Sequence, residues 1–442
     1  MTAFRLRRSS PNCARRWQSS LRKGESWRRR SRRRWRGCVK VGEWRKCELG
    51  DVIELKRGYD LPSRLRTGGE FPLISSSGRS DTHDQSKVSG PGVVTGRYGT
   101  IGQVFYIEED FWPLNTTLYV RDFKGNNPRF IYYFLQGLNW ESFNDKSGVP
   151  GVNRNDVHRA IVSIADQDTQ KAIVGVLSSI DDKIELNRRT NETLEAMAQA
   201  IFRDWFVDFG PVHRKMQGET DPTAILGGLI ERSAKAAALA ALFPDTLDDN
   251  ELPQAWKFVP LDSLAVVTMG NSPAGSTYNG EGIGVPLVNG PVEYGDFFLR
   301  KVKWTTAPNK LAKRGDLIVC VRGSTTGRHA FADAEYCLGR GVASIRGRED
   351  DQEYVETAML QSMDRLLEKT TGSVFPSLSS GDIKDFDLID PGKNLIQAFV
   401  ELVRPMKRKT WHSVKEVSEL VETRDYLLPK LMSGEIRSGA FC

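Results

Sequence analysis

Hydrophobic residues recur along two long stretches at the alternating four- and three-residue spacing of a helix with one packed face. The first stretch runs from Ile173 to Trp205 and the second from Phe399 to Leu431, and their seam positions match at one constant offset. Polar residues near the middle of both stretches, such as Asn187, fit a coiled-coil seam in which a buried amide sets the register. A helix of about 33 residues is about 50 Å long. An ordinary core helix of one compact domain is the alternative, but a domain of this size would not cover such a length, so the pattern predicts two paired helices.

The same repeat extends to the segments before each helix. Each half opens with a tryptophan, then has a short extended segment, an apolar strand that runs into a glycine turn, a proline-centred loop that ends in an acid, and another short strand. At nearly the same offset, Arg97 matches Arg322 and Gly102 matches Gly327. The matching segments are Trp44–Asp51 and Trp256–Ser263, Phe71–Ile74 and Val285–Val288, Val93–Gly102 and Ile318–Gly327, Val149–Val157 and Phe375–Ile383, and Ala160–Ile164 and Phe386–Ile389.

This order of elements predicts an α+β fold with a pseudo-two-fold repeat. Each half has a mixed sheet with helices, and the two long helices form an antiparallel coiled-coil spacer between the halves. A partly ordered linker with Gly-Pro, Gly-Gly and an Ala-rich helical piece connects them. Two similar units on a spacer suit a target with two half-sites, because duplex DNA repeats its groove about every 34 Å. The predicted boundaries are residues 1–41 for a tail, 42–166 for the first domain, 167–209 for its helix, 210–254 for the linker, 255–391 for the second domain and 392–437 for its helix.

Several of these segments, taken in order and twice, resemble the specificity subunits of type I restriction–modification systems. The resemblance covers residues 42–437 and rests on the opening Trp, the Pro-Leu-Ile segment, the Gly-x-Tyr-Gly-Thr-Ile-Gly turn, the loop before each long helix, and Ile180–Ile184 and Ala200–Phe206 in the first helix. It implies that each half is a target recognition domain that reads one part of a split double-stranded DNA sequence. It also implies that the spacer helices bind two methyltransferase (modification) subunits, and that restriction/translocase subunits join them.

Charge is distributed unevenly along the chain. Residues 1–40 carry thirteen Arg and two Lys against the single acid Glu25, whereas the remaining residues carry more acids than bases, so the overall net charge of +7 comes from the tail. The tail has almost no aliphatic residues and no periodicity. A basic arm that grips phosphates, a targeting peptide and an upstream extension from a mis-set start codon are the alternatives. The abrupt change of pattern at Val39 favours the extension.

Candidate DNA-binding residues lie on the polar loop after the first extended segment and on the two glycine turns. Arg bonds a guanine edge, Asn an adenine edge, and Ser and Thr hydroxyls reach phosphates. The alternative for each residue is an ordinary surface loop or turn, and the loops around Pro150 and Pro376 are expected to be structural corners. The candidates are Ser75, Ser76, Ser77, Arg79, Arg97, Tyr98, Thr100 and Asn115 in the first half, and Asn289, Arg322, Ser324, Thr325 and Thr326 in the second.

Catalytic signatures are not found in the sequence. It has no complete cofactor-binding glycine motif, no Walker lysine motif, no Asn/Asp-Pro-Pro-aromatic loop and no Cys/His spacing typical of zinc, so we expect neither an enzyme nor a cofactor or metal. No apolar stretch reaches the roughly 20 residues of a membrane helix, and a cytoplasmic protein is expected. A coiled-coil scaffold and the remnant of a fused methylase–specificity protein are the alternatives. Aromatic residues near the end of the first helix are the expected subunit-docking residues: Phe202, Trp205, Phe206 and Phe209.

Overall fold

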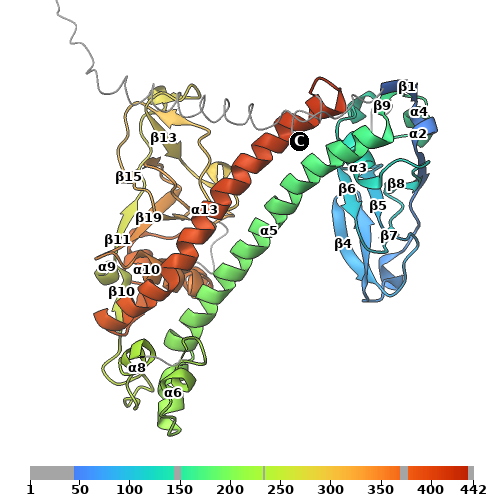
Figure 1. Ribbon diagram of the computed structural model, residues 1–442. Helices are drawn as coiled ribbons and strands as arrows, with labels where there is room; N and C mark the ends of the chain where they lie inside the picture. Colours follow the sequence, from blue (N-terminus) through green and yellow to red (C-terminus); the bar gives the residue numbers. More distant parts are fainter. Residues whose placement is uncertain (1–43, 144–150, 232–233, 369–376, 437–442) are drawn as a thin grey trace, which may run out of the picture. The chain divides into compact units, whose positions relative to one another are not determined.

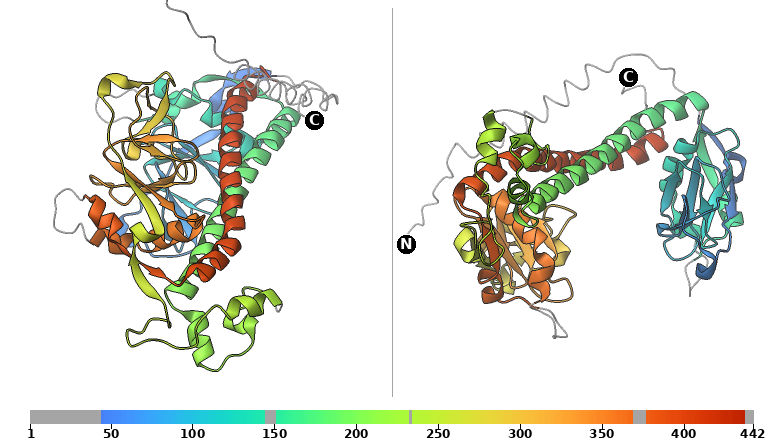
Figure 2. Two further views of the ribbon diagram at one scale, coloured as in Figure 1. Left: turned by 90° about the vertical axis from the view of Figure 1, so that its left-hand side faces the viewer. Right: turned by 90° about the horizontal axis from the view of Figure 1, so that it is seen from below.

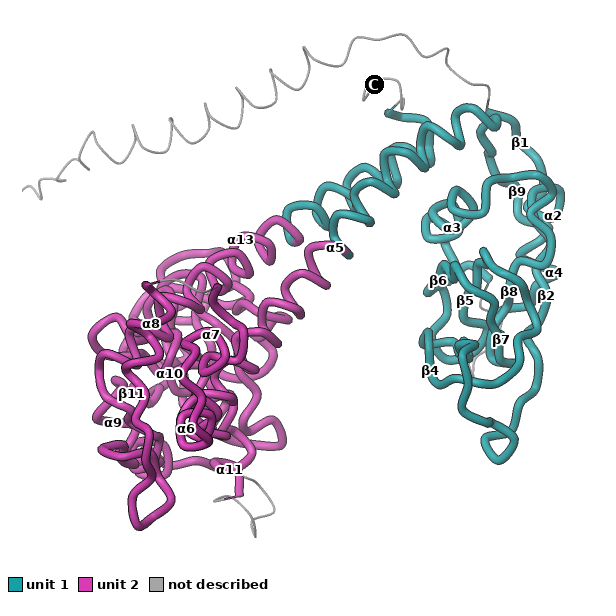
Figure 3. Tube along the Cα trace, turned by 60° about the horizontal axis from the view of Figure 1, so that its bottom comes forward, with its two compact units in different colours: residues 1–185, 418–442 teal, residues 186–417 magenta. Residues whose placement is uncertain are grey.

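The computed structural model describes residues 44–143, 151–231, 234–368 and 377–436. The predicted tail at 1–41 and the two prolines Pro150 and Pro376 lie outside these ranges. The chain forms two compact units, shown in Figure 3, and both long helices contribute to each of them. Residues 1–185 and 418–442 belong to the first unit and residues 186–417 to the second.

The first unit is built on three antiparallel or mixed sheets, with the strand orders β1-β9, β2-β8-β5-β6 and β4-β3-β7. Its main core lies between the β2-β8-β5-β6 sheet and helix α3, which Asn127 caps by accepting hydrogen bonds from two backbone amides. The elements before the long helix are β1 (Trp44–Glu48), α2 (Leu49–Val52), β2 (Glu54–Arg57), β3 (Phe71–Ser75), β4 (Gly78–His83), β5 (Gly92–Gly96), β6 (Val104–Ile107), β7 (Trp112–Pro113), β8 (Thr117–Asp122), α3 (Pro128–Gln136), α4 (Arg154–His158) and β9 (Ile161–Ala165).

The second unit repeats this arrangement with a larger third sheet, which has five strands in place of three. Its strand orders are β10-β20, β11-β19-β16-β17 and β12-β14-β13-β18-β15. The elements are β10 (Lys257–Pro260), α9 (Leu261–Leu264), β11 (Ala265–Met269), β12 (Tyr278–Asn279), β13 (Val285–Val288), β14 (Trp304–Thr305), β15 (Leu311–Ala312), β16 (Leu317–Cys320), β17 (His329–Phe331), β18 (Tyr336–Leu338), β19 (Val342–Gly347), α10 (Gln352–Gln361), α11 (Met363–Glu368), α12 (Ser380–Lys384) and β20 (Asp387–Asp390).

The two long helices are α5 (Gln167–Phe206) and α13 (Lys393–Met432). In each unit a segment of α5 runs beside a segment of α13 (Figures 1 and 2). In the first unit the beginning of α5 packs on the end of α13, where Ile173 and Leu177 share a core with Leu427 and Leu431. In the second unit the end of α5 packs on the beginning of α13. The predicted α+β fold with antiparallel long helices is therefore confirmed.

Two features of the chain differ from a simple reading of its sequence. Helix α13 continues through Pro405 and Pro429, although a proline removes one backbone donor and crowds the preceding turn. The stretch 210–254 was expected to be a partly ordered linker. It contains the Ala-rich helix that was expected, α8 (Ala234–Ala240), and also α6 (Gly210–Met216) and α7 (Pro222–Ile225). Apolar side chains of this stretch complete the core of the second unit.

Candidate nucleic-acid interface

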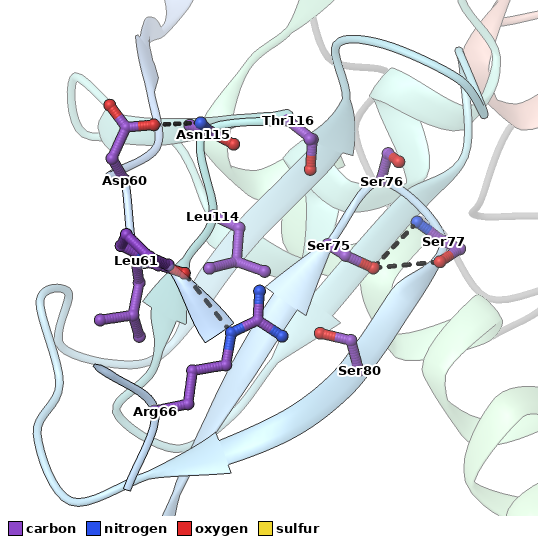
Figure 4. Close-up of a pocket in the computed structure, with 11 residues that line it drawn as sticks. Asp60, Leu61, Arg66, Ser75, Ser76, Ser77, Ser80, Leu114, Asn115 and Thr116 are labelled. Atoms are coloured by element: carbon purple, nitrogen blue, oxygen red, sulfur yellow. Dashed lines mark hydrogen bonds between the residues drawn. The ribbon is translucent and has the colours of Figure 1, made fainter. Parts of the chain in front are cut away.

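A pocket of about 400 Å³ opens on the first unit beside the turn between β3 and β4. Figure 4 shows that its polar side chains come from three separate segments: the one that holds Asp60 and Arg66, the β3–β4 hairpin, and the one that holds Asn115 and Thr116. The Ser75 hydroxyl lies 3.0 Å from that of Ser77 and donates to the Gly78 carbonyl, whereas Asn115 donates its amide hydrogen to Asp60. Of the residues predicted from the sequence, Ser75, Ser76, Ser77 and Asn115 meet here; Asp60, Arg66, Ser80 and Thr116 were not predicted.

A second pocket, of about 550 Å³, lies at the glycine turn of the same unit. It brings the predicted Arg97 and Tyr98 together with two arginines that the sequence analysis missed, Arg57 and Arg154. The Arg97 guanidinium carbon lies 4.5 Å from the centre of the Tyr98 ring. Within the described ranges no carboxylate pairs with Arg97 or Arg154, and Arg57 has only an exposed 3.8 Å pair with Asp60. Three cationic groups therefore face one hollow with little neutralisation.

The backbone explains why these arginines converge. The segment after the Pro150 loop pairs with the turn, because the Val152 amide donates to the Arg97 carbonyl at 3.0 Å. Asn153 then caps α4, which starts at Arg154. Arg57 ends β2, whose neighbour in the sheet is β8. A sequence signal for Arg154 was present, namely a capping Asn one residue before it, but Arg57 follows an ordinary strand and carries no such signal.

Segment Leu114–Leu118 separates the two pockets. Leu114, Asn115 and Thr116 line the first pocket and Leu118 lines the second. The Thr116 carbonyl accepts a hydrogen bond from the Arg97 amide at 2.8 Å, so the serine-rich and the arginine-rich pockets are neighbours on one surface.

Two predicted residues of the first unit line neither pocket. Arg79 is exposed and forms an ion pair with Glu109, which partly neutralises it. Thr100 is half-buried in the glycine turn, and its carbonyl lies so close to Gly96 that a Cβ there would approach it to 1.9 Å. Thr100 therefore shapes the turn rather than lining a pocket.

In the second unit the predicted residues gather on one turn and on the strand end beside it. Arg322 and Ser324 are exposed. The hydroxyl of Thr326 donates to the Gly323 carbonyl at 2.7 Å and that of Thr325 lies 3.4 Å from the Cys320 sulfur, so both take part in local turn contacts. Asn289 packs against Gly339 and Gly341, and the Gly341 carbonyl accepts a hydrogen bond from the Val321 amide.

The match of Arg97 with Arg322 needs correction by one residue. The Leu378 amide donates to the Val321 carbonyl, as the Val152 amide does to Arg97. Correspondingly, Arg322 bridges to Ser377 as Tyr98 bridges to Gly151. Arg322 therefore occupies the place of Tyr98, and the place of Arg97 is taken by a valine. The sequence offset failed because the second turn is one residue longer before the shared glycine.

The prediction of the subunit-docking residues was wrong for three of its four members. The side chains of Phe202, Trp205 and Phe206 are at most 3% exposed. They pack on Tyr354, Phe399 and neighbouring aromatic rings within the second unit. Phe209 is partly buried against Trp256. The α6–α8 segment and α10 cover this end of α5, and the sequence pattern did not reveal that cover.

The described residues also bear on metal binding and on membrane insertion. In the parts of the chain that the structure covers, no three His, Cys, Asp or Glu side chains gather as a metal ion requires. Among the helices in those parts, none combines the length and the apolar character needed to cross a bilayer.

Comparison with known proteins places this surface in context. Residues 42–196 match the family model described as the type I restriction modification DNA specificity domain. The chain is 27% identical to the type I restriction enzyme HindI specificity subunit of Haemophilus influenzae, over 90% of this chain and 100% of that protein. It is 24% identical to the MjaIX specificity subunit of Methanocaldococcus jannaschii, over 70% of this chain and 69% of that protein. The crystal structure of a type I S subunit from M. genitalium shares the fold, with a TM-score of 0.59 at 16% identity, and covers 89% of this chain and 97% of that one.

Proposed function

Because this chain belongs to the specificity subunits of type I restriction–modification systems, we propose that each of its two units reads one half of a split DNA sequence. The chain itself is a non-catalytic subunit that gives a larger DNA-binding complex its sequence specificity. The observation that carries the proposal is the duplicated turn, which in the first unit presents three arginines and a tyrosine in one hollow.

The two pockets of the first unit bind different parts of the DNA. Arg57, Arg97 and Arg154 hold phosphates of the duplex, because guanidinium groups with little neutralisation in a hollow bind phosphate oxygens strongly. The serine-rich pocket beside them takes base edges, with Asn115 as the reader of an adenine edge. Asp60 orients that amide through its hydrogen bond. The DNA contacts of the second unit come from Arg322, Ser324 and Asn289.

Partner subunits bind along the outer faces of α5 and α13. Three of the four predicted docking aromatics are buried, so the docking surface has to include other exposed apolar residues. Leu186 and Met197 of α5 are 59% and 42% exposed. Their spacing along the helix places them on one face, about three turns from each other. We propose that two methyltransferase subunits dock on such exposed faces in the cytoplasm and that restriction/translocase subunits join the complex.

Exchange of one recognition region tests the modular function. Residues 44–160 are replaced by the corresponding residues of a relative with a different target, and the methylated sites are sequenced in cells that also express the modification subunits. The expected result is a new sequence in one half-site with the other half unchanged. Exchange of residues 257–390 is the matched control and should alter the opposite half. If either exchange altered both halves, separate reading by the two units would be refuted.

A second experiment separates this function from a scaffold without a role in nucleic-acid binding. The chain assembled with its modification subunits is titrated with duplex DNA that contains the methylated split site. We expect a specific gel shift, and a site with one half scrambled should bind more weakly. Leu186→Asp together with Met197→Asp should reduce the assembly with the modification subunits, whereas the exposed Tyr426→Asp on α13 tests the other helix. Normal assembly by both variants would contradict the proposed docking faces.

A further inference from the structure

Each unit contains a polar junction that joins the two long helices to a helix of the recognition region. In the first unit Asp181 of α5 accepts hydrogen bonds from the Tyr133 hydroxyl of α3, at 2.6 Å, and from Arg424 of α13, at 3.1 Å. In the second unit Lys407 of α13 pairs with Glu195 of α5 at 3.0 Å and with Glu356 of α10 at 3.2 Å.

The two junctions have equivalent centres in the repeat but opposite charges. Asp181 and Lys407 are separated by the same offset as the two seams. In both units this central residue contacts one recognition-region helix and one partner long helix. The centre is an acid that meets a base in the first unit, and a base that meets two acids in the second. Both junctions are sheltered, since the side chains of Asp181 and Lys407 are 19% and 5% exposed.

We propose that this charge inversion makes each half of the chain pair with the other half and disfavours pairing between like halves of two chains. The contacts within each unit show which residues meet in an antiparallel pair. The partner residues Arg424 and Glu195 lie within one helical turn of equivalent places in the repeat. If two copies of α5 paired in the same register, Asp181 would therefore come next to Glu195. If two copies of α13 paired, Lys407 would come next to Arg424.

Both like pairings therefore place equal charges together in a partly buried position, where Coulomb repulsion is screened much less than in water. The unlike pairing places opposite charges there. Charged positions beside an apolar seam select partners in this way in coiled coils. This selection acts only between the two halves of the chain and does not depend on DNA binding.

The test builds each like pairing inside the full-length chain. Lys407→Asp gives α13 the residue that α5 carries at the same place, so that an acid faces Glu195 and Glu356. Lys407→Met removes the charge without adding repulsion and is the matched control. We expect the midpoint of thermal unfolding of Lys407→Asp to lie about 5 °C below that of Lys407→Met. Adding Glu195→Lys to Lys407→Asp should recover part of that difference.

The same experiment at the Asp181 junction of the first unit reverses the charge of the other central residue. This junction is more exposed, so the proposal remains testable if Lys407→Asp does not fold. Asp181→Lys then faces Arg424 as in a pair of α13 helices, and Asp181→Asn is its neutral control. We expect the lysine variant to melt lower than the asparagine variant, and Arg424→Asp to restore it. Equal melting temperatures of the charged and neutral variants at both junctions would overturn the proposal.

Discussion

The two recognition regions share the same order of strands, turn and capped helix, but their turns differ in length and in residues. In each, a short capped helix follows the loop that pairs with the turn. Asn153 caps α4 by accepting from the Asn155 amide, and Ser379 caps α12 by accepting from the Asp382 amide. The first turn is one residue shorter and needs Gly96, because a Cβ there would lie 1.9 Å from the Thr100 carbonyl. The second turn is longer and has Cys320 at that place. The shorter turn is thus more constrained than the longer one.

The regions also differ in the charges that they present. The places of Arg57, Arg97 and Arg154 in the first region correspond to Met269, Val321 and Ser380 in the second. The second region has instead the exposed Arg322 at the place of Tyr98. The duplicated fold therefore presents different charges at equivalent backbone positions, so the two regions cannot be assumed to have equivalent binding surfaces.

The largest effect is expected from a Cβ in the tighter turn. Gly96→Ala should lower the free energy of unfolding of the first unit by about 3 kcal/mol, because backbone atoms cannot move aside as a flexible side chain does. Cys320→Ala, the matched change in the second turn, should cost about 1 kcal/mol. Urea denaturation of the full-length variants measures both. A cost for Gly96→Ala no larger than that for Cys320→Ala would refute the difference in turn constraint.

The next largest effect is expected on DNA affinity, because the two regions differ in the number of arginines at the turn. The triple variant Arg57→Ala, Arg97→Ala and Arg154→Ala should weaken binding of the assembled complex to its DNA site about a hundredfold and reduce the slope of log affinity against log salt by about 3. Arg322→Ala should reduce the slope by about 1. Fluorescence anisotropy at several salt concentrations gives these values, with Arg79→Ala as the control because Glu109 already neutralises that side chain. Equal slopes for the triple and the Arg322 variants would contradict the comparison.

A change in the serine-rich pocket should alter selectivity rather than general affinity. Asn115→Ala is expected to relax discrimination at a single base pair of one half-site, by about 1–3 kcal/mol, with little change in the salt dependence. Binding to a panel of DNA sites with single substitutions would reveal this. Asn289→Ala removes the predicted amide of the second unit and should affect the other half-site, although Asn289 occupies the place of Ser75 in the repeat. A uniform loss over all positions would show that Asn115 does not read a base.

The smallest expected effect is a difference between the two capped helices in how their contribution to stability depends on pH. His158 ends α4, and its Nε2 accepts a hydrogen bond from the Leu55 amide at 2.9 Å. Burial lowers the pKa of His158 below its ordinary value of 6.5. The unfolded chain then binds the proton more readily, so the folded state loses stability as the pH falls below about 6.5.

The corresponding residue in the second region is Lys384, which pairs with Asp262 at 3.3 Å. We expect His158→Gln to reduce the loss of thermal stability between pH 7.5 and pH 5.5 by an amount equivalent to about 1 kcal/mol or less. Differential scanning calorimetry at both pH values measures it. The same pH dependence in the variant and the unchanged chain would remove His158 as its source.

Much of the architecture was predictable because it depends on periodic and local signals. The heptad pattern predicted both long helices and their pairing, since an apolar seam of that length has to be buried along its course. The length of the connecting segment predicted that the pair is antiparallel. The repeat predicted that whatever occurs in one half has a counterpart in the other. The serine loop and the glycine turn were predicted from residue type and turn chemistry, and both contribute to the pockets.

The sequence by itself determined the seams, the repeat and the turn residues, because these follow from spacing along the chain. Only the tertiary structure decided that Arg57 and Arg154 join Arg97, since they come from segments far from it along the chain. It also decided that Phe202, Trp205 and Phe206 are interior side chains and that Arg322 replaces Tyr98. In each case the position or burial of the side chain depends on a segment that is distant in the sequence. The local pattern of residues therefore does not predict it.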